Sequence, residues 1–222
     1  MAKITINKQA AQQRIKAILP LLKKTYPNAK CALIHSNPLE LLVATILSAQ
    51  CTDVRVNIVT KTLFEKYKSA TDWANAPLEQ IEQDIKSTGF YHNKAANIQK
   101  ACQKIISDFG GKVPDKMEEL LTLNGVGRKT ANVLLGNAFN TPGVVCDTHV
   151  LRLSRRLQLS AKTDDAVKLE FDLMEIVPMK NWTLFSHLLV FHGRGFCKAR
   201  RPDCGKCPIA KYCPAANDPK LW

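Results

Sequence analysis

The segment Leu-Asn-Gly-Val-Gly-Arg-Lys-Thr-Ala at residues 123–131 contains a lysine two residues after a turn that two glycines flank. We expect Gly125 and Gly127 to permit a left-handed backbone that brings N–H groups close to an anion, with Val126 packed inward. A helix beginning near Arg128 adds its N-terminal amides and its positive end. The pattern predicts a helix-hairpin-helix clamp on a DNA phosphate backbone, although an ordinary turn between two core helices is the alternative.

Lys129 lies in the first turn of that second helix, where two roles are open to it. One role is contact with a phosphate. The other is nucleophilic, because a neutral amine can attack the C1′ carbon of a damaged nucleoside, expel the base and form a Schiff base. Desolvation and the positive helix end would favour the neutral amine. The Schiff base then permits β-elimination of the 3′ phosphate.

Such chemistry also needs a carboxylate that stabilises the developing sugar cation and moves protons. Asp147 follows the apolar run 144–146 and precedes a predicted helix, so it is a candidate for this role. Its simpler role is an N-cap, a task that Thr148 can share. The two roles of Asp147 do not exclude each other.

A third feature is a group of four cysteines near the end of the chain. Four thiolates in so short a segment require neutralisation by a metal centre, which also holds together a loop too small for its own core. Only the middle pair has the C-x2-C spacing typical of zinc sites, so iron–sulfur is favoured over zinc. Basic residues in the loop, among them Lys198 and Arg200, predict a second contact with the DNA backbone; a solvated basic loop is the alternative. The cysteines are Cys197, Cys204, Cys207 and Cys213.

The composition agrees with a polyanionic partner. The chain of 222 residues has 32 Lys and Arg against 19 Asp and Glu, a formal net charge of +13, which favours binding to phosphates through counterion release. We find no membrane-spanning run, signal peptide or lipidation motif, so no membrane partner is expected. Residues 1–39 lack acidic residues. We interpret this segment as a basic amphipathic helix rather than an organelle-targeting sequence.

The elements that must position these residues read as helices separated by Pro and Gly. Pro38 opens a run too apolar for a surface helix, so we expect a central buried helix there. Asp53 is a candidate cap for the next helix. The run 144–146 is the only plausible strand, so the fold class is all-α. Cys31, Cys51, Cys102 and Cys146 are expected to be ordinary core residues. Helices are expected near 38–47, 53–64, 78–89, 93–109, 114–121, 130–139, 148–158, 164–176 and 181–190.

Taken together, these motifs resemble endonuclease III, the DNA glycosylase and abasic-site lyase of base excision repair. The resemblance runs from about Leu39 to Cys213, nearly the whole chain. It includes the segment Leu-Ser-Ala-Gln at 47–50, the hairpin segment 125–133, Asp-Thr-His at 147–149, His-Gly-Arg at 192–194 and the cysteine spacing.

The resemblance implies that Lys129 is the Schiff-base nucleophile and Asp147 its partner. The four clustered cysteines would bind a [4Fe–4S] cluster. Gln50 matches a residue that enters the space left by a flipped nucleotide. Phe90 stands where the family commonly has a smaller aliphatic residue, so an aromatic wedge is expected to stack on flanking bases. Asp53 matches an acidic position near the pocket.

The family architecture implies two helical domains flanking a DNA-binding cleft. A six-helix barrel with the hairpin spans 31–141, and residues 1–30 plus 142–222 form the cluster domain. The implied activity is removal of oxidised or saturated pyrimidines from double-stranded DNA, followed by cleavage at the abasic site. A monomer in a reducing, cytoplasmic and nucleoid-associated location is expected.

Two rival functions remain open from sequence. An adenine glycosylase of the same superfamily shares the hairpin and the cysteines, but it typically lacks a lysine at position 129 and uses a glutamate in the helix equivalent to 41–50. No carboxylate follows Glu40 in that helix here. A non-catalytic iron–sulfur DNA-binding protein would retain the charge, the hairpin and the cluster, but would have no use for Lys129 together with Asp147.

Overall fold

The computed structural model describes residues 6–221, and these residues contain helices and no strand. Residues 1–5 and Trp222, which belong to the expected cluster domain, lie outside the described residues. The all-α prediction is confirmed, and the run 144–146 does not form a strand. Among the described residues, no helix has both the length and the hydropathy needed to span a bilayer.

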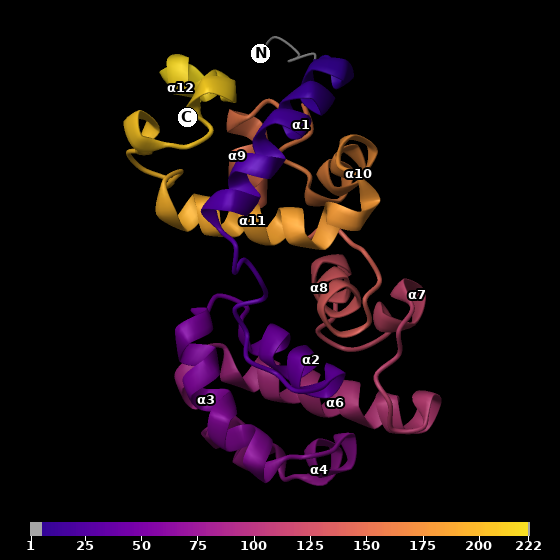
Figure 1. The fold of residues 1–222 in the computed structure, drawn as a ribbon. Helices are drawn as coiled ribbons and strands as arrows, with labels where there is room; N and C mark the ends of the chain where they lie inside the picture. The colour runs from indigo at the N-terminus through magenta and orange to yellow at the C-terminus, as the bar shows by residue number, and fades with distance from the viewer. Residues whose placement is uncertain (1–5, 222) are drawn as a thin grey trace. The chain divides into compact units, whose positions relative to one another are not determined.

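The chain divides into two compact units, which Figure 1 shows as ribbons. One unit is Cys31–Thr141; the other combines the segment that ends at Lys30 with the segment that begins at Pro142. The helices of the first are α2 (Pro38–Leu47), α3 (Asp53–Lys66), α4 (Ala70–Asn75), α5 (Leu78–Ile85), α6 (Tyr91–Phe109), α7 (Met117–Leu120) and α8 (Arg128–Ala138). Those of the second are α1 (Lys8–Thr25), α9 (Thr148–Arg156), α10 (Ala166–Ile176), α11 (Trp182–Gly195) and α12 (Pro214–Asn217).

Helix α2 lies at the centre of the first unit, as its apolar sequence predicts. Asn37 caps its N-terminus by accepting a hydrogen bond from Glu40 N, and Pro38 fits the first turn because no amide partner is needed there. Every residue from Leu41 to Leu47 is buried, because α3, α6 and α8 all pack against α2. The helix is therefore a fixed support for the loops at its ends.

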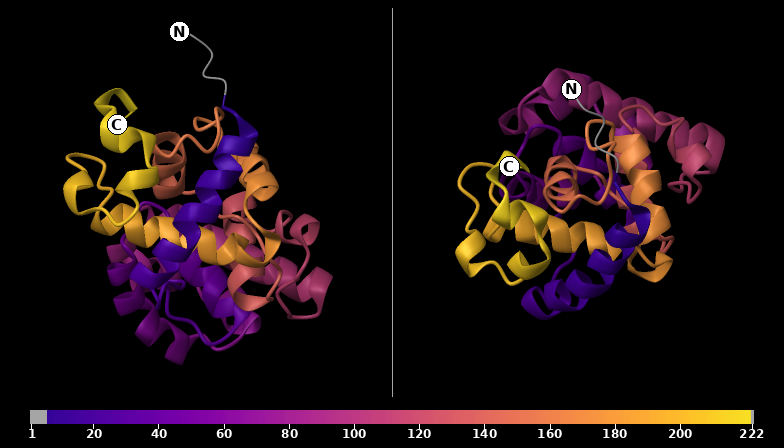
Figure 2. Two further views of the ribbon diagram at one scale, coloured as in Figure 1. Left: turned by 45° about the horizontal axis from the view of Figure 1, so that its top comes forward. Right: turned by 90° about the horizontal axis from the view of Figure 1, so that it is seen from above.

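The second unit is built on α1, α9, α10 and α11. The apolar stripe of α1, which includes Ile15, Ile18 and Leu22, is fully buried in this core, so the amphipathic-helix interpretation of the N-terminal segment is confirmed. Helix α1 packs against α10 and α11, and Figure 2 shows it crossing α11. Helix α11 packs in turn against α9. Gly193 allows that approach, since a Cβ there would lie 2.6 Å from His149 Nδ1.

Three local expectations need correction. The cap of α3 is Thr52, whose side chain accepts from Arg55 N, while Asp53 is already the first helical residue. A threonine hydroxyl and an aspartate both suit this role, so the sequence alone did not choose between neighbours. Helix α6 begins at Tyr91 rather than near Asn93. Of the four scattered cysteines, Cys102 and Cys146 are buried, but Cys31 and Cys51 are only half-buried at the edge of the core.

Candidate active site and cluster loop

The hairpin joins α7 to α8 through a turn that depends on one glycine. Gly125 has a φ of 75°, and a Cβ there would lie 3.0 Å from Asn97 Cβ on α6. The residue therefore needs both the left-handed backbone and the missing side chain. Val126 is buried, as expected, and its N–H donates to Leu123 O at 3.1 Å, which fixes the turn against the core.

Gly127 differs from the expectation that both glycines are left-handed. Its φ is −95° and its ψ is 176°, an extended conformation in which it serves as the N-cap of α8. N-cap residues adopt this backbone while their carbonyl accepts the first helical bond, here from Ala131 N at 2.9 Å. No described atom lies within 4 Å of a Cβ built on Gly127. The space before the first amides of α8 is therefore open to an anion.

Lys129 follows in the first turn of α8, where its side chain is exposed, and Arg128 beside it is half-buried. The hairpin thus presents the amine to solvent at the positive end of a helix. The expected desolvation of Lys129 is not provided by its own protein surroundings, since its side chain is exposed. A substrate that covers this surface would have to supply it.

Asp147 is the N-cap of α9, in the other unit. Its Oδ1 accepts from His149 N at 2.9 Å and from Val150 N at 2.8 Å. The segment before it is held by Val145 N, which donates to Ser186 Oγ on α11 at 2.9 Å. The carboxylate is half-buried and fixed in orientation. Both of these hydrogen bonds go to Oδ1.

Gln50 and Phe90, the two expected wedge residues, share an unusual backbone. Both are exposed, and both have left-handed conformations, with φ of 53° for Gln50 and 50° for Phe90. Such a conformation costs a residue with a Cβ roughly 1 kcal/mol and persists only when the surroundings impose it. Each residue therefore stands at the tip of a tightly constrained loop.

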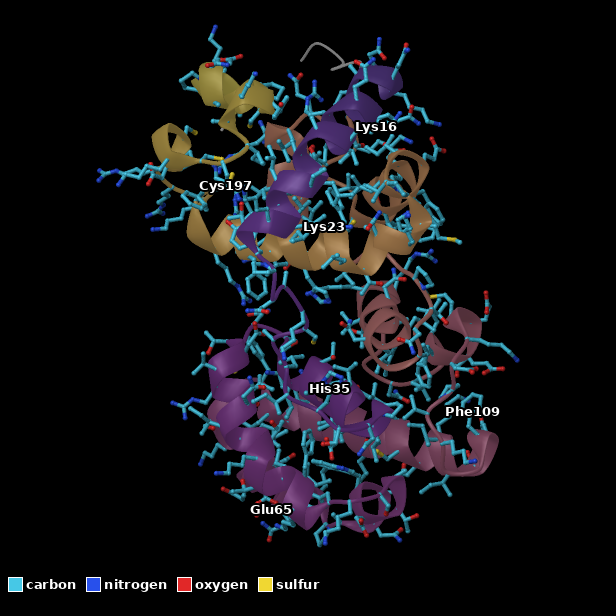
Figure 3. All side chains as sticks on the ribbon, in the orientation of Figure 1. Lys16, Lys23, His35, Glu65, Phe109 and Cys197 are labelled. Atoms are coloured by element: carbon cyan, nitrogen blue, oxygen red, sulfur yellow. The ribbon has the colours of Figure 1, made fainter. Side chains whose placement is uncertain are left out.

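The four clustered cysteines line one cavity in the unit that contains α9 and α11. The remaining lining is largely apolar and includes Leu153, Phe196 and Ile209. Burial, together with the charges of the other three thiols, raises the pKa of the Cys207 thiol to about 11. Thiolates so placed need the positive charge of a metal centre to be stable. Figure 3 marks Cys197 where the loop leaves α11.

Within residues 6–221, no three Cys, His, Asp or Glu side chains converge closely enough to hold a single metal ion.

Arg156 on α9 gives a second indication of the kind of group that the thiols bind. Its Nη1 donates to Cys197 Sγ at 3.2 Å, and its buried Nε has no hydrogen-bond partner among the described residues. Buried donors are nearly always paired. A donor left unpaired beside the four thiols fits a site for a group that carries acceptors, as the sulfides of a cluster do.

His192 contacts another of the four thiols. It is buried, and burial lowers its pKa to about 4, so it is neutral near pH 7. Its Nδ1 lies 3.0 Å from the Tyr26 hydroxyl and its Nε2 lies 3.4 Å from Cys207 Sγ. Burial raises the pKa of Tyr26 to about 12, so this hydroxyl keeps its proton and can donate to Nδ1. The Nε2 proton then faces the sulfur.

Sequence reasoning missed Arg156, Tyr26 and the contact made by His192. The motif His-Gly-Arg at 192–194 contributes to the resemblance, but its sequence does not predict a contact with a cysteine. Nothing in the local pattern assigns Arg156 to the cysteine loop, because its partner Cys197 is 41 positions away. Lys198 and Arg200 lie in that loop and are exposed, as a contact with phosphates requires.

Two protein-family models match the segments of this chain that contain these residues. The HhH-GPD superfamily of base excision DNA repair proteins matches residues 43–179, a segment that includes the hairpin, Lys129 and Asp147. The iron–sulfur binding domain of endonuclease III matches residues 197–213. The second match begins and ends at the first and last of the four clustered cysteines.

Whole-chain comparisons agree with these matches. A protein named endonuclease III from Synechocystis sp. is 52% identical over 218 residues, which cover 98% of this chain and 99% of the relative. A solved structure of a non-covalent endonuclease III–DNA complex is 46% identical, with a TM-score of 0.89 and coverage of 95% of this chain and 99% of that chain. A trapped endonuclease III–DNA covalent intermediate has the same identity and TM-score, with coverage of 94% and 98%.

Proposed function

Because this chain belongs to the endonuclease III family, we propose that Lys129 is the nucleophile of its glycosylase and lyase reactions and that Asp147 assists it. Membership makes the chain a base excision repair enzyme that binds DNA and contains a [4Fe–4S] cluster. The observation that carries the residue assignment is the exposed side chain of Lys129, placed two residues after the Gly127 cap at the positive end of α8.

The proposed reaction uses the hairpin to hold the DNA and the lysine to break bonds. A phosphate occupies the open space before Gly127, and the amides at the start of α8 donate hydrogen bonds to it. The flipped nucleotide then covers Lys129, and its neutral amine attacks C1′ while the bond from C1′ to the base breaks. Opening of the sugar gives a Schiff base between C1′ and Nζ. Removal of a C2′ proton then expels the 3′ phosphate, and water releases the lysine.

Asp147 contributes charge and proton transfer at the sugar. Its Oδ1 is held by two backbone amides of α9, so the carboxylate does not need to reorganise as positive charge develops on the sugar. Its Oδ2 is directed to the substrate in this proposal. The carboxylate also accepts a proton from the attacking amine.

We extend the proposal to the substrate and its recognition. The preferred lesions are oxidised or saturated pyrimidines in double-stranded DNA, and abasic sites are cleaved as well. The exposed side chains of Gln50 and Phe90 fill the space that the flipped nucleotide leaves, and Phe90 stacks on the flanking bases. The resemblance to the family supports this assignment.

Four further elements complete the proposal. Cys197, Cys204, Cys207 and Cys213 bind the cluster, which holds the terminal loop in place when it is bound. Lys198 and Arg200 then contact the DNA backbone. The protein acts as a monomer. A reducing, cytoplasmic location suits its eight cysteines, none of which forms a disulfide.

Borohydride trapping on a duplex with an abasic site tests the central assignment. Reduction of the Schiff base should leave a covalent protein–DNA adduct with the wild type, and Lys129→Gln should leave none. Lys112→Gln is the matched control, because Lys112 is also an exposed lysine of the same unit. A wild-type protein that forms no adduct, or an adduct that persists in Lys129→Gln, would refute the assignment.

A further inference from the structure

Lys94 is a lysine on the buried face of α6, in line with Ile98, Ala101 and Ile105. Only 4% of its surface is exposed. Its Nζ donates to Leu47 O and to Thr88 O, each at 2.8 Å. A buried ammonium needs such partners, because removal of a charge from water is costly. Burial lowers the pKa of Lys94, an effect that the nearby Cys51 thiol opposes in part.

The two acceptors lie at the ends of the helices that lead into the two loops with the expected wedge residues. Leu47 is the last residue of α2 and lies three positions before Gln50. Thr88 ends the short 3-10 helix Lys86–Thr88 and lies two positions before Phe90. One ammonium therefore joins two loops that are far apart in sequence. The carbonyl at the C-terminus of α2 is also where the helix dipole favours a cation.

The backbone at the two loop tips explains why such a link is needed. Gln50 and Phe90 both hold left-handed conformations that an isolated loop would relax. Thr88 Oγ1 donates to Ile85 O at 2.8 Å, and Cys51 N donates to Ser48 O at 3.1 Å. These bonds order each loop internally. Among the described contacts, only Lys94 Nζ bonds to carbonyls of both loops.

We propose that Lys94 is a positioning residue that holds the loops of Gln50 and Phe90 at a fixed separation, so that both side chains enter the DNA stack together. The inference rests on the proposed function, in which these side chains replace a flipped nucleotide. Lys94 touches neither the DNA nor the reacting atoms. Its removal affects the step that requires a base pair to be broken, because that step depends on both wedges acting at once.

Replacement of Lys94 by methionine tests this role, since methionine retains an unbranched apolar stem and loses the donors. Single-turnover rates are measured on two duplexes, one with a paired oxidised pyrimidine and one with a preformed abasic site. We expect Lys94→Met to slow base release from the paired lesion about 10-fold or more, as for a misplaced group, and to change nicking of the abasic site about twofold at most. Lys100→Met on the exposed face of α6 is the control and should match the wild type on both.

A second comparison removes the wedges themselves. In a Gln50→Ala, Phe90→Ala background, Lys94→Met should produce little further reduction of base release, because residues that act through one another are not additive. The fluorescence of 2-aminopurine beside the lesion reports the unstacked state and should fall in Lys94→Met. The same fluorescence should be unchanged in the control Lys100→Met.

The outcomes separate the inference from the function on which it rests. If Lys94→Met lowers the rate of base release and the rate of nicking by the same factor, the inference is overturned, since this would indicate general structural damage. It would also be overturned if Lys94→Met slowed base release in the Gln50→Ala, Phe90→Ala background as much as it does in the wild type. A wild-type protein that neither releases the base nor nicks the abasic site would instead refute the proposed function.

Discussion

The guanidinium of Arg156 reaches Cys197 across 41 positions of sequence, with its Nη1 3.2 Å from Cys197 Sγ. The same side chain donates to Lys198 O at 2.7 Å and to Ala199 O at 2.9 Å. Helix α9 therefore begins with Asp147 at its N-cap and, at its other end, holds the start of the cysteine loop. Loop and helix are joined by a buried cation rather than by apolar packing alone.

Arg156→Met should weaken the cluster loop. It removes several hydrogen bonds from a buried charged donor, so we expect the free energy of unfolding to fall by roughly 3 kcal/mol. The iron–sulfur absorbance per mole of protein, measured at about 400 nm, should fall with it. Arg155→Met is the control, because the Arg155 side chain is exposed on the same helix. Unchanged absorbance and thermal stability in Arg156→Met would show that the cation does not hold the loop.

Asp147→Asn distinguishes the role of Asp147 as the N-cap of α9 from its proposed role in the reaction. Asparagine caps a helix about as well as aspartate, so the melting temperature should change little. Base release should fall about 100-fold or more, because the carboxylate charge is removed. Asp165→Asn is a matched control, since Asp165 caps α10 in the same unit by accepting from Val167 N and Lys168 N. Turnover close to that of the wild type in Asp147→Asn would remove Asp147 from the mechanism.

The two hairpin glycines should respond differently to alanine. Gly125→Ala introduces a left-handed alanine against Asn97, so we expect stability to fall by roughly 1–2 kcal/mol. Gly127→Ala has an extended backbone and open space, so the fold should be retained. Its methyl group would enter the open space that we propose for the phosphate, and DNA affinity should fall uniformly across sequences. Thermal unfolding and titration with DNA check both variants; equal destabilisation by the two substitutions would contradict the assigned backbone roles.

Lys198→Ala and Arg200→Ala should weaken DNA binding without changing sequence preference. Each removes one exposed charge from the cysteine loop. For each DNA phosphate that the variant no longer neutralises, the slope of log affinity against log salt concentration should fall in magnitude by about 0.9. Lys16→Ala on α1 removes the same charge from an exposed site of that unit and serves as the comparison. Weaker binding confined to one DNA sequence would point to base contacts instead.

Much of the fold was predictable because its signals are local. The buried helix α2, the amphipathic α1 and the hairpin between α7 and α8 follow from apolar spacing, Pro and Gly within a few residues. Where two neighbours offered the same local chemistry, as Thr52 and Asp53 did, the prediction was wrong. Gly127 was also misjudged, since a glycine permits a left-handed backbone without requiring it.

The sequence by itself determined which residue types are present at the chemical positions: Lys129 after the hairpin, Asp147 before a helix, and four cysteines at a cluster spacing. Only the tertiary structure decided how distant segments support them. Gly125 must be glycine because Asn97 of α6 lies against it, and Lys94 bonds to two loops through carbonyls that are 47 and 6 positions away. Capping and helical periodicity act between near neighbours, whereas a buried cation finds its partners only once the helices have packed.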